Sequence, residues 1–191
     1  MRVRWLFIVL YVASLTACSS GISTKADVIR YINDPENGLK KITESNNILT
    51  VLTYRPSLLM TSNAYRKNVP NAQFDDKLYF VLSLSANNAE VLKQLEPGRY
   101  STMVQVFAFN MSNYITISAG KGKGIAPESC FYQPTYGVSR ANELLLIFDK
   151  KKLALTDDLY IDIREFGLGT GDMNFRFDSD DIERISAVQI N

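Results

Sequence analysis

The residue types that the chain lacks limit the chemistry it can perform. None of its 191 residues is histidine, and only two are cysteine. Imidazole is the commonest general base and metal ligand near neutral pH, so Ser/His/Asp and Cys/His catalysis are excluded, as are zinc sites built on histidine. We expect no cofactor and no metal. An enzyme would have to work with carboxylates alone, and a glycosidase needs two of them about 5 to 9.5 Å apart.

An aromatic-rich stretch near residue 130 provides the candidate binding surface. Phe131, Tyr132 and Tyr136 lie close together in a segment that also contains a proline and a glycine. Aromatic side chains offer a large contact area with few rotors, so they can stack on sugars or anchor a protein partner. The alternative is that they fill the core. The neighbouring Cys130 has no histidine to activate it and is expected to be an inert, partly buried thiol.

Two glycine-rich segments invite comparison with phosphate-binding loops. Residues 167–171 read Gly-Leu-Gly-Thr-Gly, and residues 120–124 alternate glycine with lysine. A dinucleotide loop needs a strand before it and a helix after it, whereas strand patterns flank residues 167–171 on both sides. We therefore expect a hairpin loop there, with glycines at positive φ. The 120–124 segment is interpreted as a flexible basic loop that could touch anionic headgroups or glycans.

Two further patterns match functional signatures only in part. Four carboxylates lie between Asp178 and Glu183, but the register of a calcium loop is absent, and Asp178 can instead cap a short helix ending at Ile185. Ser118 and Lys121 have the Ser-x-x-Lys spacing of serine acyl enzymes. That signature must open a helix, which the neighbouring glycines oppose.

The elements that would position these residues are mostly strands. Period-two apolar patterning and β-prone residues predict seven of them, with an eighth at 187–190; the seven are 48–55, 79–84, 100–109, 111–118, 144–148, 159–163 and 173–177. The continuous apolar run 144–148 is typical of a strand buried on both faces. One short helix is expected from Asn88 to Glu96, capped by Asn87 and stopped by Pro97. This pattern favours a mainly β fold, a single-domain antiparallel β-sandwich of about seven to eight strands with one short helix.

The amino-terminal residues are typical of an export signal. Residues 1–18 contain two arginines, an apolar run that is too short to span a bilayer, and small residues before Cys18. Residues 15–18, Leu-Thr-Ala-Cys, resemble the lipobox of bacterial lipoproteins. We therefore divide the chain into a signal peptide at 1–17, a lipid-anchored tether with a short helical and turn segment at 18–45, and a β-sandwich domain at 46–191.

The resemblance to lipoproteins implies that Cys18 carries a diacylglyceryl thioether and anchors the chain to a membrane. More than one acyl chain gives stable anchoring. With Cys18 lipidated, Cys130 has no partner for an intrachain disulfide. In lipoproteins of this kind an Asp after the cysteine retains the protein at the inner membrane, so Ser19 favours the outer membrane. No acidic run follows Cys18, which favours an orientation facing the periplasm.

Charge and composition limit the class of partner. The chain is 46% hydrophobic and 21% charged, as expected for a domain with one core. Removal of residues 1–17 takes away Arg2 and Arg4, which leaves 19 basic residues against 20 acidic ones, a net charge of −1. Nucleic-acid binding requires clustered positive charge and is not expected.

Three functional hypotheses follow from these observations. The first is a non-enzymatic envelope lipoprotein whose sandwich docks another envelope protein, for example as an accessory of a secretion, motility or assembly system. The second is a glycan- or small-ligand-binding lipoprotein with Tyr132 and Tyr136 in its site. The third is a carboxylate-based hydrolase.

Overall fold

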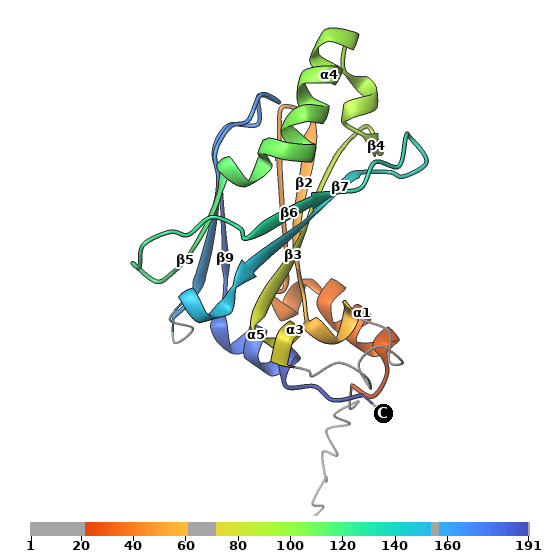
Figure 1. Ribbon diagram of the computed structural model, residues 1–191. Helices are drawn as coiled ribbons and strands as arrows, with labels where there is room; N and C mark the ends of the chain where they lie inside the picture. The colour runs from red at the N-terminus through yellow and green to blue at the C-terminus, as the bar shows by residue number, and fades with distance from the viewer. Residues whose placement is uncertain (1–21, 61–71, 154–156, 191) are drawn as a thin grey trace, which may run out of the picture.

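The computed structural model describes residues 22–60, 72–153 and 157–190, and Cys18 and the signal peptide lie outside this part of the chain. In the described residues, nine strands form two antiparallel sheets (Figure 1). The larger sheet has the order β1-β2-β3-β7-β6, with β4 added beside β3, and the smaller has the order β5-β8-β9. The larger sheet comprises β1 (Lys40–Ser45), β2 (Ile48–Arg55), β3 (Lys77–Ala86), β4 (Ala89–Glu90), β6 (Ser129–Tyr132) and β7 (Asn142–Asp149). The smaller comprises β5 (Ile115–Ala119), β8 (Leu159–Ile163) and β9 (Met173–Phe177). The expected mainly β, antiparallel sandwich is confirmed.

Aromatic contacts join the two sheets. Phe80 on β3 is fully buried, and its ring lies 5.0 Å from that of Phe177 on β9 in the opposite sheet. Tyr54 and Phe148 contact the same ring edge-on at 5.4 and 6.1 Å. Such edge-to-face pairs stabilise a core beyond the area they bury. The centre of the sandwich is therefore built around Phe80.

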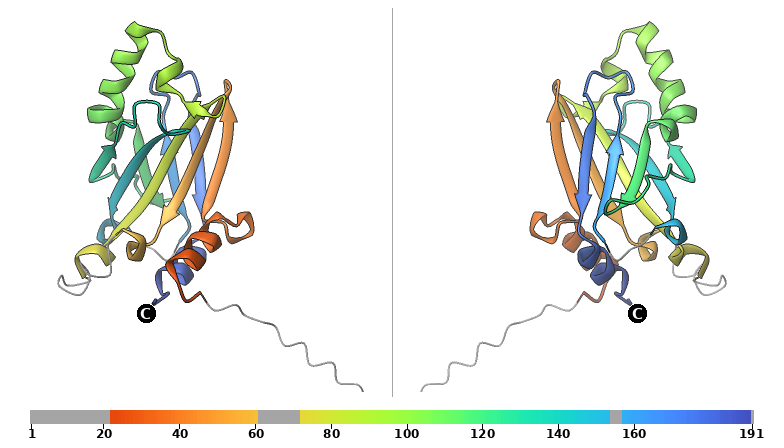
Figure 2. Two further views of the ribbon diagram at one scale, coloured as in Figure 1. Left: turned by 90° about the vertical axis from the view of Figure 1, so that its right-hand side faces the viewer. Right: turned by 90° about the vertical axis from the view of Figure 1, so that its left-hand side faces the viewer.

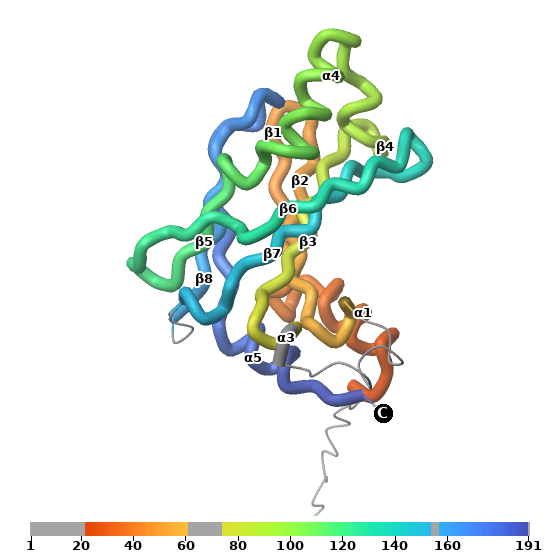
Figure 3. Tube along the Cα trace, viewed as in Figure 1, coloured from red at the N-terminus to blue at the C-terminus, as the bar shows by residue number. Residues whose placement is uncertain are grey.

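Helices lie at the two ends of the sandwich (Figures 2 and 3). At the amino-terminal end are α1 (Lys25–Asn33), η1 (Pro35–Asn37), η2 (Ser57–Leu59), α3 (Ala72–Asp75), η6 (Lys150–Lys152) and α5 (Ser179–Ser186). At the other end, which we call the distal end, are η3 (Leu92–Gln94), α4 (Pro97–Gln105), the π-helical turn η4 (Val106–Asn110) and η5 (Met111–Asn113). No helix among the described residues has both the length and the apolar character needed to cross a bilayer.

The strand expected at 100–109 is wrong, because these residues form α4 and η4. Tyr, Thr and Val in this stretch are β-prone, which produced the error. The buried positions Met103, Val106, Phe107 and Met111 instead follow helical spacing. In the next predicted strand, 111–118, only the part from Ile115 onward is extended, because η5 precedes it.

The helix expected from Asn88 to Glu96 is also wrong. Asn87 and Asn88 have φ values of 50° and 57° and form the two-residue turn of the β3–β4 hairpin, so Asn87 is not a helix cap. A 3-10 turn, η3, follows β4. Pro97 starts α4 rather than stopping a helix, because its fixed φ suits the first helical turn.

The strand expected at 144–148 exists, but only one of its faces is fully buried. Leu144, Leu146 and Phe148 are fully buried, whereas Leu145 and Ile147 face outward and are half-buried. The prediction that both faces are buried is therefore wrong for the outer face, because the sequence of one strand does not show what covers that face.

Both ends of the described chain differ from the expectation. Residues 187–190 form no strand; Ala187 ends α5. The boundary expected at residue 45 falls inside the fold, since β1 pairs with β2 along its whole length. Val28 and Ile32 of α1 are fully buried in the core. The helical segment expected after the tether is thus part of the domain, and the described chain has four α-helices instead of one.

Candidate functional site

A small pocket at the distal end brings together residues from four elements. We call it the distal pocket, and its volume is about 160 Å³. Its walls come from β4, η3, α4, β6 and the loop of residues 133–141 that joins β6 to β7; the lining residues are Glu90, Leu92, Lys93, Tyr100, Tyr132, Pro134, Tyr136 and Gly137. Small-molecule sites usually occupy about 300 Å³ or more. The distal pocket is therefore of a size to accept one side chain or one sugar ring.

Tyr136 is the most unusual residue of this pocket. Its φ is 51°, in the left-handed region that bulky residues rarely adopt, and its side chain is 83% exposed. The other non-glycine residues at positive φ in the described parts of the chain are all asparagines in hairpin turns, where this conformation is common. An exposed ring contributes little burial to folding, so folding alone does not explain this strained backbone.

A buried carboxylate holds the loop that carries Tyr136. Glu90 on β4 is 3% exposed, and its Oε1 accepts hydrogen bonds from the Thr135 hydroxyl and, at 3.3 Å, from the Ser139 amide. These two donors flank Tyr136 and Val138 in sequence. The Val138 amide also donates to the Thr135 carbonyl at 3.0 Å, closing a turn. Glu90 thus fixes both sides of a loop tip whose Val138 is 91% exposed.

Asn142 connects this loop to the rest of the pocket. It is 1% exposed, and its Nδ2 lies 3.3 Å from Glu90 Oε2 and 3.3 Å from the Tyr132 hydroxyl, while its Oδ1 accepts the Leu92 amide at 2.9 Å. A buried network in which every polar group is paired rigidifies its surroundings. Asn142 therefore joins β4, η3, β6 and β7 behind the residues that line the pocket.

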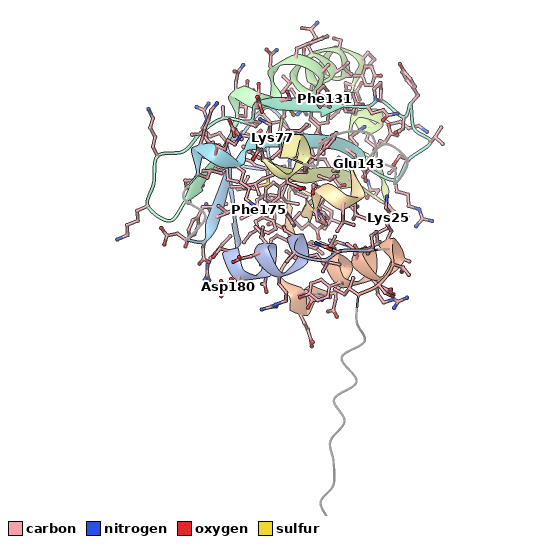
Figure 4. All side chains as sticks on the ribbon, turned by 60° about the horizontal axis from the view of Figure 1, so that its bottom comes forward. Lys25, Lys77, Phe131, Glu143, Phe175 and Asp180 are labelled. Carbon is pink, nitrogen blue, oxygen red and sulfur yellow. The ribbon has the colours of Figure 1, made fainter. Side chains whose placement is uncertain are left out.

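The structure separates the three aromatic residues selected from the sequence. Tyr132 is half-buried, packs edge-on against Phe107 at 5.4 Å and lines the distal pocket together with Tyr136. Phe131 is 58% exposed and, because successive side chains of a strand alternate, lies on the other face of β6. Figure 4 shows Phe131 and Glu143 on the larger sheet, with Asp180 on α5 at the opposite end. Phe131 is therefore not part of the pocket.

Burial changes the acidity of two groups near the pocket. It raises the pKa of the Tyr132 hydroxyl, an effect that the negative charge of Glu90 reinforces. Burial raises the pKa of the Cys130 thiol to about 11. Cys130 is therefore protonated near neutral pH, and its thiol is partly buried, as expected.

The glycine-rich loop at 167–171 is closed around a carboxylate of the same chain, that of Glu165. It joins β8 to β9, and its three glycines all have positive φ, as expected of this hairpin. The amides of Gly167, Gly169 and Gly171 donate to the Glu165 carboxylate. The amides that would cradle a phosphate are thus already occupied. Partial burial would raise the pKa of Glu165, but these hydrogen bonds outweigh it and lower the pKa.

Two of the remaining sequence patterns lie around β5. Gly120 and Lys121 line a shallow hollow with Asp157 and Asp158, and Asp158 forms an ion pair with Arg176 at 2.6 Å. Ser118 is a buried residue of β5, so the Ser-x-x-Lys spacing falls on a strand and a turn.

The acidic segment near the carboxyl terminus is helical. Asp178 caps α5 by accepting the Asp180 amide at 2.9 Å, as expected from the sequence. Asp181 pairs with Arg184 at 3.1 Å. In the part of the chain that the structure describes, no three carboxylate or thiol side chains are grouped as a metal site would require.

A second, larger hollow lies against α5 and has a volume of about 690 Å³. It is lined by apolar residues such as Leu159 and Ile182 together with the charged side chains of Lys150, Asp180 and Glu183. The distal pocket differs from it in the strained, exposed tyrosine and the buried carboxylate that fixes its loop. These features make the distal pocket the candidate site.

Comparisons with protein-family models, with curated proteins and with solved structures find no match to this chain.

Sequence reasoning found two of the pocket residues and missed the others. Glu90, Lys93 and Tyr100 lie some 30 to 50 positions away from Tyr132 and Tyr136 in sequence, and the segment that carries them was assigned the wrong secondary structure. One signal was available: Glu90 is a charged residue in an otherwise apolar setting, between Ala89 and Val91.

Proposed function

We propose that this protein is a non-enzymatic lipoprotein of the cell envelope that docks another envelope protein through the distal pocket and the loop beside it. The observation that carries the proposal is Tyr136, which is exposed, strained and held in place by a buried carboxylate. Rigid, exposed aromatic residues around a small pocket are typical of the few residues that dominate protein interfaces. A fixed loop also loses little conformational entropy on binding.

The position of the expected anchor supports a pocket that faces away from the membrane. Cys18 lies seven residues before the start of α1, which an extended chain spans in about 25 Å. Because α1 is at the end of the sandwich opposite the distal pocket, a lipid on Cys18 would leave the pocket facing away from the membrane (Figure 1). Ser19 and the absence of an acidic run favour the outer membrane and the periplasmic side. The near-neutral charge of the mature chain gives no support for a nucleic-acid partner.

The residues of the pocket favour docking over catalysis. Glu90 is the one carboxylate among the lining residues, and both of its oxygens accept hydrogen bonds from the protein. A carboxylate-based hydrolase would need a second carboxyl in the same cleft. The second candidate function is glycan binding, which is favoured by the presence of Tyr132 and Tyr136 in one pocket of the size of a sugar ring.

The anchor is tested by replacing the lipidated residue. Cys18→Ala should leave unprocessed precursor and abolish labelling by radioactive fatty acid, because the thioether can form only on that sulfur. Cys130→Ser is the matched control and should label normally. Labelling that persists in Cys18→Ala would show that the lipid is attached elsewhere.

Docking is tested by native-gel analysis of membranes solubilised in mild detergent. Tyr136→Ala should shift the protein from a larger complex to the free form, with the unfolding midpoint nearly unchanged, because the ring is exposed. Phe131→Ala removes another exposed aromatic, from the other face of β6, and should leave the complex intact. A complex that survives Tyr136→Ala would refute docking through the pocket.

A further inference from the structure

The chemistry of the distal pocket limits what a partner can place in it. Three tyrosines together with Leu92 and Pro134 provide an enclosure that suits an apolar group. Two charged residues also line the pocket, Glu90 and Lys93. The sign of charge that the pocket accepts therefore depends on which of these two is available to a ligand.

Glu90 is committed to the protein. Its side chain is 3% exposed and receives hydrogen bonds from the Thr135 hydroxyl, the Ser139 amide and the Asn142 amide group. An ion that is buried and fully hydrogen-bonded loses these interactions if it turns to a ligand, and the loop that it holds would be released. We therefore assign Glu90 to holding the loop.

Lys93 is available. Its Nζ lies about 3.0 Å from where a Cβ on Gly137 would stand, so the stem of the lysine rests against the glycine of the loop. Within the described chain, no carboxylate pairs with this ammonium. Three tyrosines alone would suit a cation, since the faces of aromatic rings attract positive charge. The Glu90 carboxylate keeps its charge, but its oxygens already accept hydrogen bonds from the protein. Lys93 is therefore the charged group that can pair directly with a ligand, and it favours an anion at its own position.

We propose that the distal pocket accepts an apolar side chain whose neighbouring carboxylate pairs with Lys93, as at the carboxyl-terminal residue of a protein partner. This inference rests on the proposed docking function and adds the chemical class of the docked group. Tyr100, Tyr132 and Tyr136 enclose the apolar group, and Lys93 selects the carboxylate. The volume of the pocket limits the anchor to one residue of about the size of leucine.

The test compares two probes of nearly the same shape, one charged and one neutral. N-acetyl-L-leucine carries the carboxylate, and N-acetyl-L-leucine amide replaces it with a neutral group. Each is titrated into the purified full-length protein in detergent, with tyrosine chemical shifts as the readout. We expect affinities in the millimolar range, with the acid bound about two- to fivefold more tightly than the amide, as for a solvent-accessible ion pair.

Variants separate charge recognition from the rest of the pocket. Lys93→Met should abolish the preference for the acid while the amide still binds, and added salt should weaken the preference in the wild type. Lys121→Met removes a lysine on a loop outside the distal pocket and should change nothing. Tyr136→Ala should weaken both probes equally.

Several results would overturn the inference. These are equal affinity for acid and amide, an unchanged preference in Lys93→Met, no binding of either probe, or tighter binding of tetramethylammonium or methyl glucoside than of the acid. If any of these results were found while Tyr136→Ala still disrupted the native-gel complex, the inference about the carboxylate would be wrong but the proposed docking function would stand. If the complex instead survived Tyr136→Ala, the proposed docking function itself would be wrong.

Discussion

At the residue scale, two carboxylates shape the loops of this protein in the same way. Glu90 holds the loop of Tyr136, and Glu165 holds the glycine-rich loop at 167–171. In each case a side chain supplies the acceptor that exposed backbone donors need. The sequence predicted the turn chemistry of residues 167–171, including the positive φ values of their glycines. It did not predict which acceptor would satisfy the loop amides, because nothing in the spacing distinguishes Glu165 from the nearby Asp172.

The lowered pKa of Glu165 makes its loop sensitive to acid. A carboxylate with a depressed folded-state pKa stabilises the fold fully above its unfolded value, here 4.5, and that contribution is lost as the pH falls through the folded-state pKa. We therefore expect the amides of Gly167, Gly169 and Gly171 to exchange with solvent faster as the pH falls through the folded-state pKa of Glu165, which lies below 4.5. Amide exchange measured by NMR, corrected for the intrinsic pH dependence, provides the check.

Substitution isolates this effect. Glu165→Gln presents one carbonyl oxygen in place of a carboxylate, so the loop amides should exchange rapidly at neutral pH and lose the acid transition. Glu96→Gln is the control, because the Glu96 side chain makes no capping hydrogen bond at α4. A transition that remains in Glu165→Gln would mean that another group controls the loop.

At the element scale, the sequence was most informative where one pattern dominated. β8 and β9 were located from alternation, because in each strand buried residues alternate with exposed or half-buried ones. α4 was misread because β-branched and aromatic residues made a helix look like a strand, although its buried residues follow helical spacing. β4 was missed because two residues are too few to show a period.

The two faces of β7 give a stability prediction. Leu144 is fully buried, whereas its neighbour Leu145 points to the outer face of the larger sheet and is half-buried. Leu144→Ala should therefore cost about 2 to 5 kcal/mol of unfolding free energy, through lost burial and a cavity. Leu145→Ala should cost about 1 kcal/mol. Urea unfolding of both variants measures the difference, and equal losses would show that both faces are equally covered.

At the scale of the whole molecule, the two ends of the sandwich differ. The amino-terminal end carries α1, whose Val28 and Ile32 are packed into the core, so a lipid attached a few residues earlier would hold this end near the membrane. The distal end carries the pocket and its fixed loop. The sandwich class could be predicted from the frequency of strands. The pocket could not, because it joins residues from Glu90 to Gly137 that only the topology brings together.

The central claim is that the distal loop contacts a protein partner in the envelope, and site-specific photo-crosslinking in intact cells tests it most directly. A photoreactive phenylalanine analogue at position 136 should give one discrete adduct with a second protein, and the same analogue at position 100 should give an adduct of the same mass. At position 131, on the other face of β6, this adduct should be absent. Equal adducts at all three positions, or none at 136 and 100, would contradict the claim.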